Sequence, residues 1–174
     1  MIEKTIQIGG RKVSYKEYGE AHNYTNNTIK PVFLLHGWGG SKESWDTLSA
    51  ELFSTLGKNA NDLRFISVDM PGFGQSEEPL SAWDVGSYTQ WFEHFVAAIY
   101  KEYGFLGNYD LIIHSFGGRI VLKLFSEEFL HSLKEARPDR VVIIAGAGVK
   151  RPLSLRVRVA GLAARVSAAT DTHA

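Results

Sequence analysis

Cysteine is absent from the sequence, which excludes disulfide bonds and metal sites built on thiolates. Neither sign of charge is in excess, since 19 lysines and arginines balance 19 aspartates and glutamates. A balanced chain does not have the basic surplus that attracts nucleic acids or anionic membranes. We therefore expect neither of these as a partner.

Long apolar segments are missing as well. The first eight residues show no basic region followed by an apolar block, which is the pattern of a signal peptide. No apolar run approaches the roughly 20 residues that a transmembrane helix needs. The 174 residues are 44% hydrophobic and can still bury a sizeable core. We expect a cytoplasmic, soluble protein with no membrane span.

What the chain does contain is an alternation of strand-like and helix-like segments. Two alternating runs joined by Gly9-Gly10 predict an antiparallel β-hairpin. Expected strands follow at 32–35, 65–68, within 109–113 and at 141–145, and the runs at 32–35 and 141–145 are typical of buried strands. Expected helices cover 43–56, 87–103, the stretch after the turn at 114–118 to about 127, and 128–136. This order predicts an α/β fold with a mostly parallel sheet flanked by helices.

Three glycine-rich turns follow three of these strands, at 36–41, 69–76 and 114–118. In a parallel sheet such turns meet at the carboxyl edge of the strands, so we expect them to form one pocket. Ser115 lies on the third turn, between a buried strand and a helix. There it could be a nucleophile backed by the helix N-terminus, or merely a helix N-cap.

The three turns, in this order and at these spacings, resemble motifs of the α/β-hydrolase family, and the resemblance covers nearly all of residues 1–150. His36-Gly37-Trp38-Gly39-Gly40 is similar to the family's oxyanion loop. Asp69-Met70-Pro71-Gly72-Phe73-Gly74-Gln75-Ser76 is similar to the turn after its fourth strand. His114-Ser115-Phe116-Gly117-Gly118 is similar to its nucleophile elbow.

The resemblance implies a role for each matching residue. Ser115 would be the nucleophile of a serine hydrolase that acts on an ester, or a related acyl or carbon–carbon bond, through an acyl-enzyme. The backbone N–H groups of Trp38 and Phe116 would form the oxyanion hole. A serine at this position also argues against the dehalogenase and epoxide-hydrolase branches, which use aspartate there. The residues expected to give structural support are His36, Gly37, Asp69, His114 and Gly117.

Two further expectations accompany these roles. The side chain of His114 should point away from Ser115, which makes it a poor general base. The substrate should be a small acyl compound, and no cofactor or metal is implied. The oligomeric state is left open.

The sequence departs from the family pattern at two points. Ile113 stands where a small residue usually precedes the elbow, so it could crowd the turn. After Ser115 the only histidines are His131 and His173, and neither they nor the nearby acids Asp139 and Asp171 fit the acid and base of a triad. The simplest account is the N-terminal part of a longer hydrolase, impaired by this loss.

On that account, residues 1–149 form a partial core domain and residues 150–174 begin a helical lid. Arginines punctuate the second segment, which is equally typical of a solvated helix face. Two other functions remain open. One is a non-catalytic relative that binds a small apolar ligand or a partner in the same pocket. The other, a dinucleotide-binding domain, is weak because the first turn reads Gly-Trp-Gly-Gly rather than Gly-x-Gly-x-x-Gly.

Overall fold

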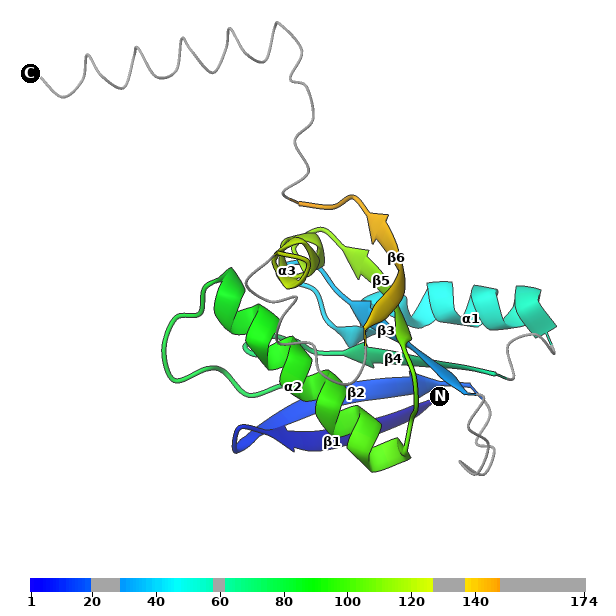
Figure 1. Cartoon of the computed structure of the whole chain (residues 1–174), viewed down its shortest axis with the longest axis horizontal. Helices are drawn as coiled ribbons and strands as arrows, with labels where there is room; N and C mark the ends of the chain where they lie inside the picture. Colours follow the sequence, from blue (N-terminus) through cyan, green and yellow to red (C-terminus); the bar gives the residue numbers. More distant parts are fainter. Residues whose placement is uncertain (20–28, 58–61, 127–136, 148–174) are drawn as a thin grey trace, which may run out of the picture.

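A computed structural model describes residues 1–19, 29–57, 62–126 and 137–147 of the chain (Figure 1). It contains a six-stranded sheet with the spatial order β1-β2-β4-β3-β5-β6. The strands are β1 (Ile2–Ile8), β2 (Arg11–Tyr18), β3 (Lys30–Leu35), β4 (Leu63–Val68), β5 (Tyr109–His114) and β6 (Pro138–Ile144). The expected helix at 128–136 and the expected lid segment 150–174 lie outside the described residues.

The antiparallel hairpin is confirmed, and its turn explains why the sequence has two glycines there. Ile8 pairs with Arg11, so only Gly9 and Gly10 connect β1 to β2. Both glycines have positive φ angles, 58° and 77°, as a tight two-residue hairpin turn requires. The second strand then pairs antiparallel with β4 and joins the hairpin to the rest of the sheet.

The other four strands run parallel, which confirms the α/β fold class with a mostly parallel sheet. The central strand β3 pairs with β4 on one side and with β5 on the other. Since five of its six side chains are buried, its continuous apolar run is needed for packing on both faces. The carboxyl ends of β3, β4 and β5 therefore meet at one edge, where the three glycine-rich turns begin.

Helices cover the two faces of the sheet unequally. The helical elements are η1 (Lys42–Trp45, a 3₁₀-helix), α1 (Asp46–Leu56), α2 (Val85–Tyr103) and α3 (Gly117–Leu124). The main core lies between the sheet, α2 and α3, and Phe33 at its centre contacts the rings of Phe92, Phe95 and Tyr109. A smaller core lies on the other face, where Trp45 and partly buried residues of α1 pack against the strands.

The long amphipathic helix α2 follows its sequence signals closely. The side chain of Asp84 caps its first turn by accepting a hydrogen bond from the Ser87 backbone N–H (2.8 Å). Gly104 ends it with φ 65°, a left-handed conformation that glycine adopts without steric cost. No helix in the described part of the chain is long and apolar enough to cross a membrane.

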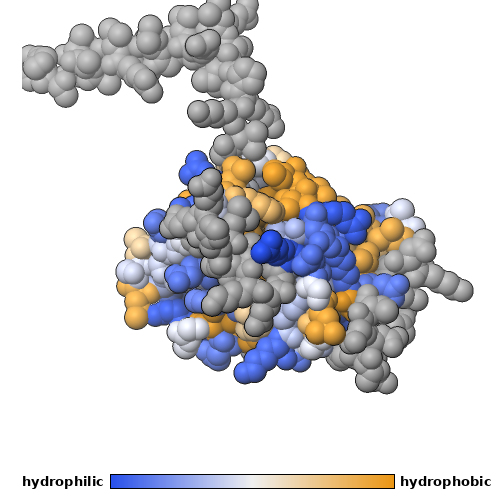
Figure 2. Space-filling model, in the orientation of Figure 1, coloured by the Kyte–Doolittle hydropathy of each residue, from blue (hydrophilic) through white to orange (hydrophobic). Residues whose placement is uncertain are grey.

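The expectation that residues 141–145 form a buried strand is wrong in part. They belong to β6, but Val142, Ile143 and Ile144 are 52%, 44% and 40% exposed. The reason is position, because β6 pairs only with β5 in the described sheet and ends its order. Figure 2 shows apolar surface gathered at the end of the molecule where β6 lies.

Candidate functional site

Ser115 occupies the sharp turn between β5 and α3. Its φ angle is +46°, a left-handed conformation that is uncommon for a residue with a Cβ atom. Backbone hydrogen bonds hold the turn, since the Ser115 N–H donates to the carbonyl of Ile144 (3.1 Å) and the Ser115 carbonyl accepts from Ala147 (2.8 Å). The side chain stays partly exposed. Strain of this kind is common at functional sites, where a side chain must be presented rather than packed.

The glycines around this turn allow three backbone segments to approach closely. A Cβ atom on Gly37 would lie 3.1 Å from the Cβ of Ser115, and one on Gly117 would lie 3.2 Å from the Cβ of Leu35. Ile113 is fully buried in the main core, 3.3 Å from the same Gly117 position. The turn therefore accommodates the side chain of Ile113 because Gly117, which lies against it, has no side chain.

The loop after β3 brings Trp38 to the same edge of the sheet. It contains a turn in which the Gly40 N–H donates to the Gly37 carbonyl (3.0 Å), and Gly39 has φ 74°. The backbone N–H groups of Trp38 and Phe116 donate no hydrogen bond to any group in residues 1–19, 29–57, 62–126 or 137–147. Neither amide is therefore engaged by an acceptor in the described chain.

His36 is completely buried and fixes the start of this loop. The Met70 backbone N–H donates to its Nε2 (3.0 Å), so this nitrogen carries no proton and the Nδ1–H donates to the Gly37 carbonyl (2.7 Å). Burial lowers the pKa of His36 below its ordinary value, although the Gly37 carbonyl and Asp69 oppose the shift. A neutral imidazole with both nitrogens engaged supports the loop and has no free site for proton transfer.

His114 shares a pocket lining with Ser115, and the expectation that its side chain points away from Ser115 stays a prediction. His114 is exposed, and together with Ser115 it lines a pocket of about 590 Å³. A Cβ atom on Gly37 would lie 2.8 Å from its Nδ1, so the ring rests against the loop that follows β3. The residues that line the pocket are Gly37, Trp38, Gly39, Gly40, Ser44, Trp45, Leu48, His114, Ser115 and Ile144.

Aromatic rings from all three turns gather beside Ser115. The Trp38 ring is 67% exposed and meets Phe73 and Phe116 edge to face, at centroid distances of 5.0 and 5.2 Å. Phe73 in turn contacts the ring of His36 (5.5 Å). These ring contacts join the three turns, but no residue of 69–76 lines the pocket with Ser115, so the expected single pocket includes residues of only the first and third turns. The aromatic rings suit an apolar, uncharged group.

The turn after β4 is held by the carboxylate of Asp69, which is completely buried. It accepts from the Gln75 backbone N–H (2.9 Å), and the Asp69 carbonyl accepts from the Ser76 hydroxyl (2.7 Å). The carboxylate also binds the backbone and side chain of Lys42. The sequence gives no sign of this role of Lys42, because no local pattern marks a lysine whose partner lies 27 positions away.

No carboxylate lines the pocket with Ser115 among the described residues. Asp139 lies at the opposite edge, near the start of β6, where it binds Lys30 (2.7 Å) and Asn108 (2.7 Å). Asp171, His131 and His173 lie outside the described residues. Nor does any group of three histidine, aspartate or glutamate side chains within the described ranges form a set that could hold a metal ion.

Curated relatives of similar sequence include hydrolases of different kinds. The chain is 30% identical over 126 residues to a 2-hydroxymuconate semialdehyde hydrolase of Pseudomonas sp. strain CF600, covering 71% of this chain and 39% of that protein. It is 32% identical over 123 residues to a haloalkane dehalogenase of Psychrobacter cryohalolentis, covering 70% of this chain and 34% of that protein. The chain thus spans less than half the length of these relatives.

Solved structures share the fold at low sequence identity. A bacterial membrane phospholipase A matches with a TM-score of 0.65 and 23% identity, over 88% of this chain and 42% of that one. The epoxide hydrolase CorEH matches with a TM-score of 0.60 and 21% identity, over 92% of this chain and 50% of that one. The family model for the alpha/beta hydrolase fold matches residues 30–155. With this match over most of its length, the chain belongs to the alpha/beta hydrolase fold family.

Proposed function

We propose that this chain carries the nucleophile and the oxyanion hole of a serine hydrolase that acts on a carboxylic ester or a related acyl or carbon–carbon bond. The observation that carries the proposal is the left-handed turn at Ser115, half-exposed beside two amides with no acceptor in the described chain. Hydrolases among the relatives support the reaction class.

In the proposed reaction the Ser115 oxygen adds to the substrate carbonyl carbon and its proton passes to a general base. The carbonyl oxygen becomes negatively charged and accepts hydrogen bonds from the N–H groups of Trp38 and Phe116. Collapse then expels the leaving group, which takes up the proton from the base, and leaves an acyl group on Ser115. Water, deprotonated by the same base, then releases the acyl group as the acid and restores the Ser115 hydroxyl. No carboxylate lines the described part of the pocket, so we expect Ser115 to react slowly unless a residue outside the described ranges activates it.

The substrate of the proposed reaction is small and largely apolar. The pocket beside Ser115 has no aspartate, glutamate, lysine or arginine in its lining, which includes the apolar residues Trp38, Trp45 and Leu48. A pocket of about 590 Å³ is within the range that holds small molecules. An uncharged ester of modest size therefore fits better than a phosphorylated or strongly acidic compound.

The test is labelling by a fluorophosphonate probe and hydrolysis of a short-chain aryl ester. We expect labelling of the unaltered chain, loss of labelling in Ser115→Ala and no loss in Ser44→Ala, because Ser44 lines the same pocket without lying on the elbow. Equal rates of ester hydrolysis in the unaltered chain and Ser115→Ala would remove Ser115 from the mechanism.

A second candidate is a non-catalytic member that binds a small apolar ligand in the same pocket. The absence of a carboxylate from the described pocket lining favours it. Under this candidate a non-hydrolysable apolar ester analogue binds, the probe leaves Ser115 unlabelled, and Trp38→Ala weakens binding.

A further inference from the structure

A buried ion pair ties the loop that carries Trp38 to the turn after β4. The backbone N–H of Lys42 donates to Oδ1 of Asp69 (2.6 Å), and its Nζ donates to Oδ2 (2.9 Å). Both side chains are completely buried. One carboxylate therefore holds the end of the loop at two points, the main chain and the tip of the side chain.

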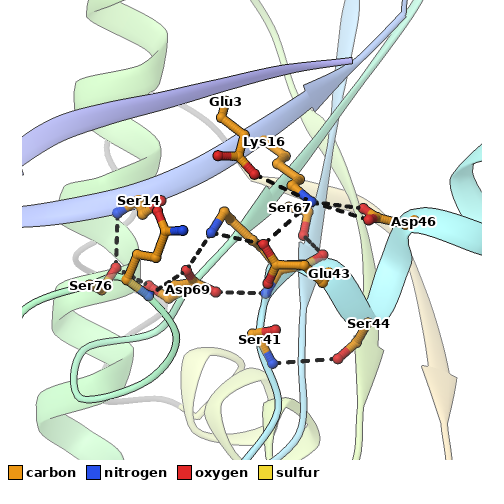
Figure 3. A network of polar contacts seen from close by, with 12 residues as sticks. Glu3, Ser14, Lys16, Ser41, Glu43, Ser44, Asp46, Ser67, Asp69 and Ser76 are labelled. Carbon is orange, nitrogen blue, oxygen red and sulfur yellow. Dashed lines mark hydrogen bonds and ion pairs between the residues drawn. The ribbon is translucent and has the colours of Figure 1, made fainter.

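Asp69 is itself held rigidly, so it can serve as an anchor. Its backbone N–H donates to the carbonyl of Ser14 on β2 (2.9 Å), and its carboxylate accepts from Gln75. A Cβ atom on Gly74 would lie 2.3 Å from the carboxylate carbon, so the turn wraps closely around it. In Figure 3, Asp69 lies between Ser76 and the chain segment that leads from Ser41 to Glu43.

The loop needs such an anchor because of its composition. Between the end of β3 and Lys42 it has six residues, and Gly37, Gly39 and Gly40 are three of them. Glycine loses more conformational freedom on folding than any other residue, so a loop rich in it is ordered only where contacts fix it. Its first end is held by His36–Met70 and its second by Lys42–Asp69 and by a hydrogen bond from the Ser67 hydroxyl to the Lys42 carbonyl (2.7 Å), with the turn from Gly40 to Gly37 between them.

A buried charged pair adds little net stability to a fold. Desolvation of two charges offsets much of their attraction, and apolar residues of similar volume often do as well. The hydrogen bonds from the main chain and the side-chain tip of Lys42 to Asp69 fix the direction of the loop, which apolar packing alone does not do. Burial alone would lower the pKa of Lys42, but hydrogen bonds to Asp69 and Glu43 raise it, so the ammonium stays charged.

We propose that the Lys42–Asp69 ion pair positions the backbone N–H of Trp38, which makes both residues positioning residues of the oxyanion hole. The catalytic part of this inference rests on the proposed function. The positioning part concerns only how the pair orders the loop at 36–41, and it can be tested separately.

The test compares Lys42→Met with Lys4→Met, a matched control. Lys4 also pairs with a buried carboxylate, that of Glu17 (3.1 Å), but in the hairpin rather than beside the loop. By NMR relaxation we expect the order parameter of the Trp38 amide to fall from about 0.85 to below about 0.6 in Lys42→Met only. Fluorophosphonate labelling of Ser115 should slow about 10²-fold in Lys42→Met, as when one oxyanion donor is removed.

Each outcome separates the two proposals. Loss of stability in both variants with an unchanged Trp38 order parameter would show that the pair only stabilises the fold, and would overturn the inference. If the unaltered chain is not labelled, the proposed function fails, while the order parameter still decides whether the pair orders the loop. Should Lys42→Met not fold, the double variant Lys42→Met/Asp69→Asn removes both charges, and a rigid Trp38 amide in it would overturn the inference.

Discussion

The imidazole of His36 accepts a hydrogen bond from the backbone N–H of Met70, with 3.0 Å between the two nitrogens. This contact joins the loops that follow β3 and β4, and it requires an unprotonated Nε2. The loop beside Ser115 is therefore held at one end by an imidazole whose pKa burial lowers below its ordinary value, and at the other by an ion pair.

Stability should fall in mild acid because of His36. Its pKa is lowered from 6.5 by burial, so below about pH 6.5 the unfolded chain takes up a proton that the folded chain does not. Above that pH the contribution of His36 to the free energy of unfolding should be constant. It should decrease as the pH falls towards the folded-state pKa. Urea denaturation at several pH values between 7.5 and 5 measures it.

The control for this prediction is His36→Gln, which offers an acceptor to Met70 but does not titrate. The other five histidines are common to both proteins, so their contributions cancel in the comparison. A variant with the same loss of stability between pH 7.5 and 5 as the unaltered chain would contradict the assignment to His36.

Gly74→Ala should destabilise the protein by about 3 kcal/mol or more. The added Cβ would lie 2.3 Å from the carboxylate carbon of Asp69, at φ 54°. Gly104→Ala is the matched control, since Gly104 has φ 65° and no atom within 4 Å of the added Cβ, and it should cost only about 1 kcal/mol. Denaturation midpoints measure both, and equal losses would mean that the backbone angle, not the contact with Asp69, sets the cost.

The fold and the three turns could be predicted because their signals are local. Gly9-Gly10 indicates the hairpin, and the spacing of apolar residues in α2 indicates its buried face. By contrast, the partnership of Lys42 with Asp69 depends on how β3 and β4 pair, which no local pattern encodes. The apolar run of β6 indicates a strand, but its exposure depends on which elements lie beside it.

Gly37→Ala should mainly slow the labelling of Ser115 by the fluorophosphonate probe. Its effect on the free energy of unfolding should be small. The new Cβ would lie 2.8 Å from Nδ1 of His114 and 3.1 Å from the Cβ of Ser115. The exposed ring can move aside, but the nucleophile turn would shift, and small misplacements cost up to about 10²-fold in rate. Probe labelling and urea denaturation measure the two effects. Gly86→Ala, in the first turn of α2, is the control and should leave labelling unchanged.

Val142→Lys and Val141→Lys should differ although the residues are neighbours in β6. Val142 is 52% exposed, while Val141 packs against the main core. A lysine at 142 can reach water, so it should change the free energy of unfolding by less than about 0.5 kcal/mol, whereas a lysine at 141 should cost about 2 kcal/mol or more. β6 is the last strand of the described sheet, and a charge on such a strand opposes pairing between molecules, so Val142→Lys should reduce any self-association of the unaltered chain. Urea denaturation and light scattering over a range of concentrations measure these effects, and unchanged scattering in Val142→Lys would show that the β6 edge does not drive association.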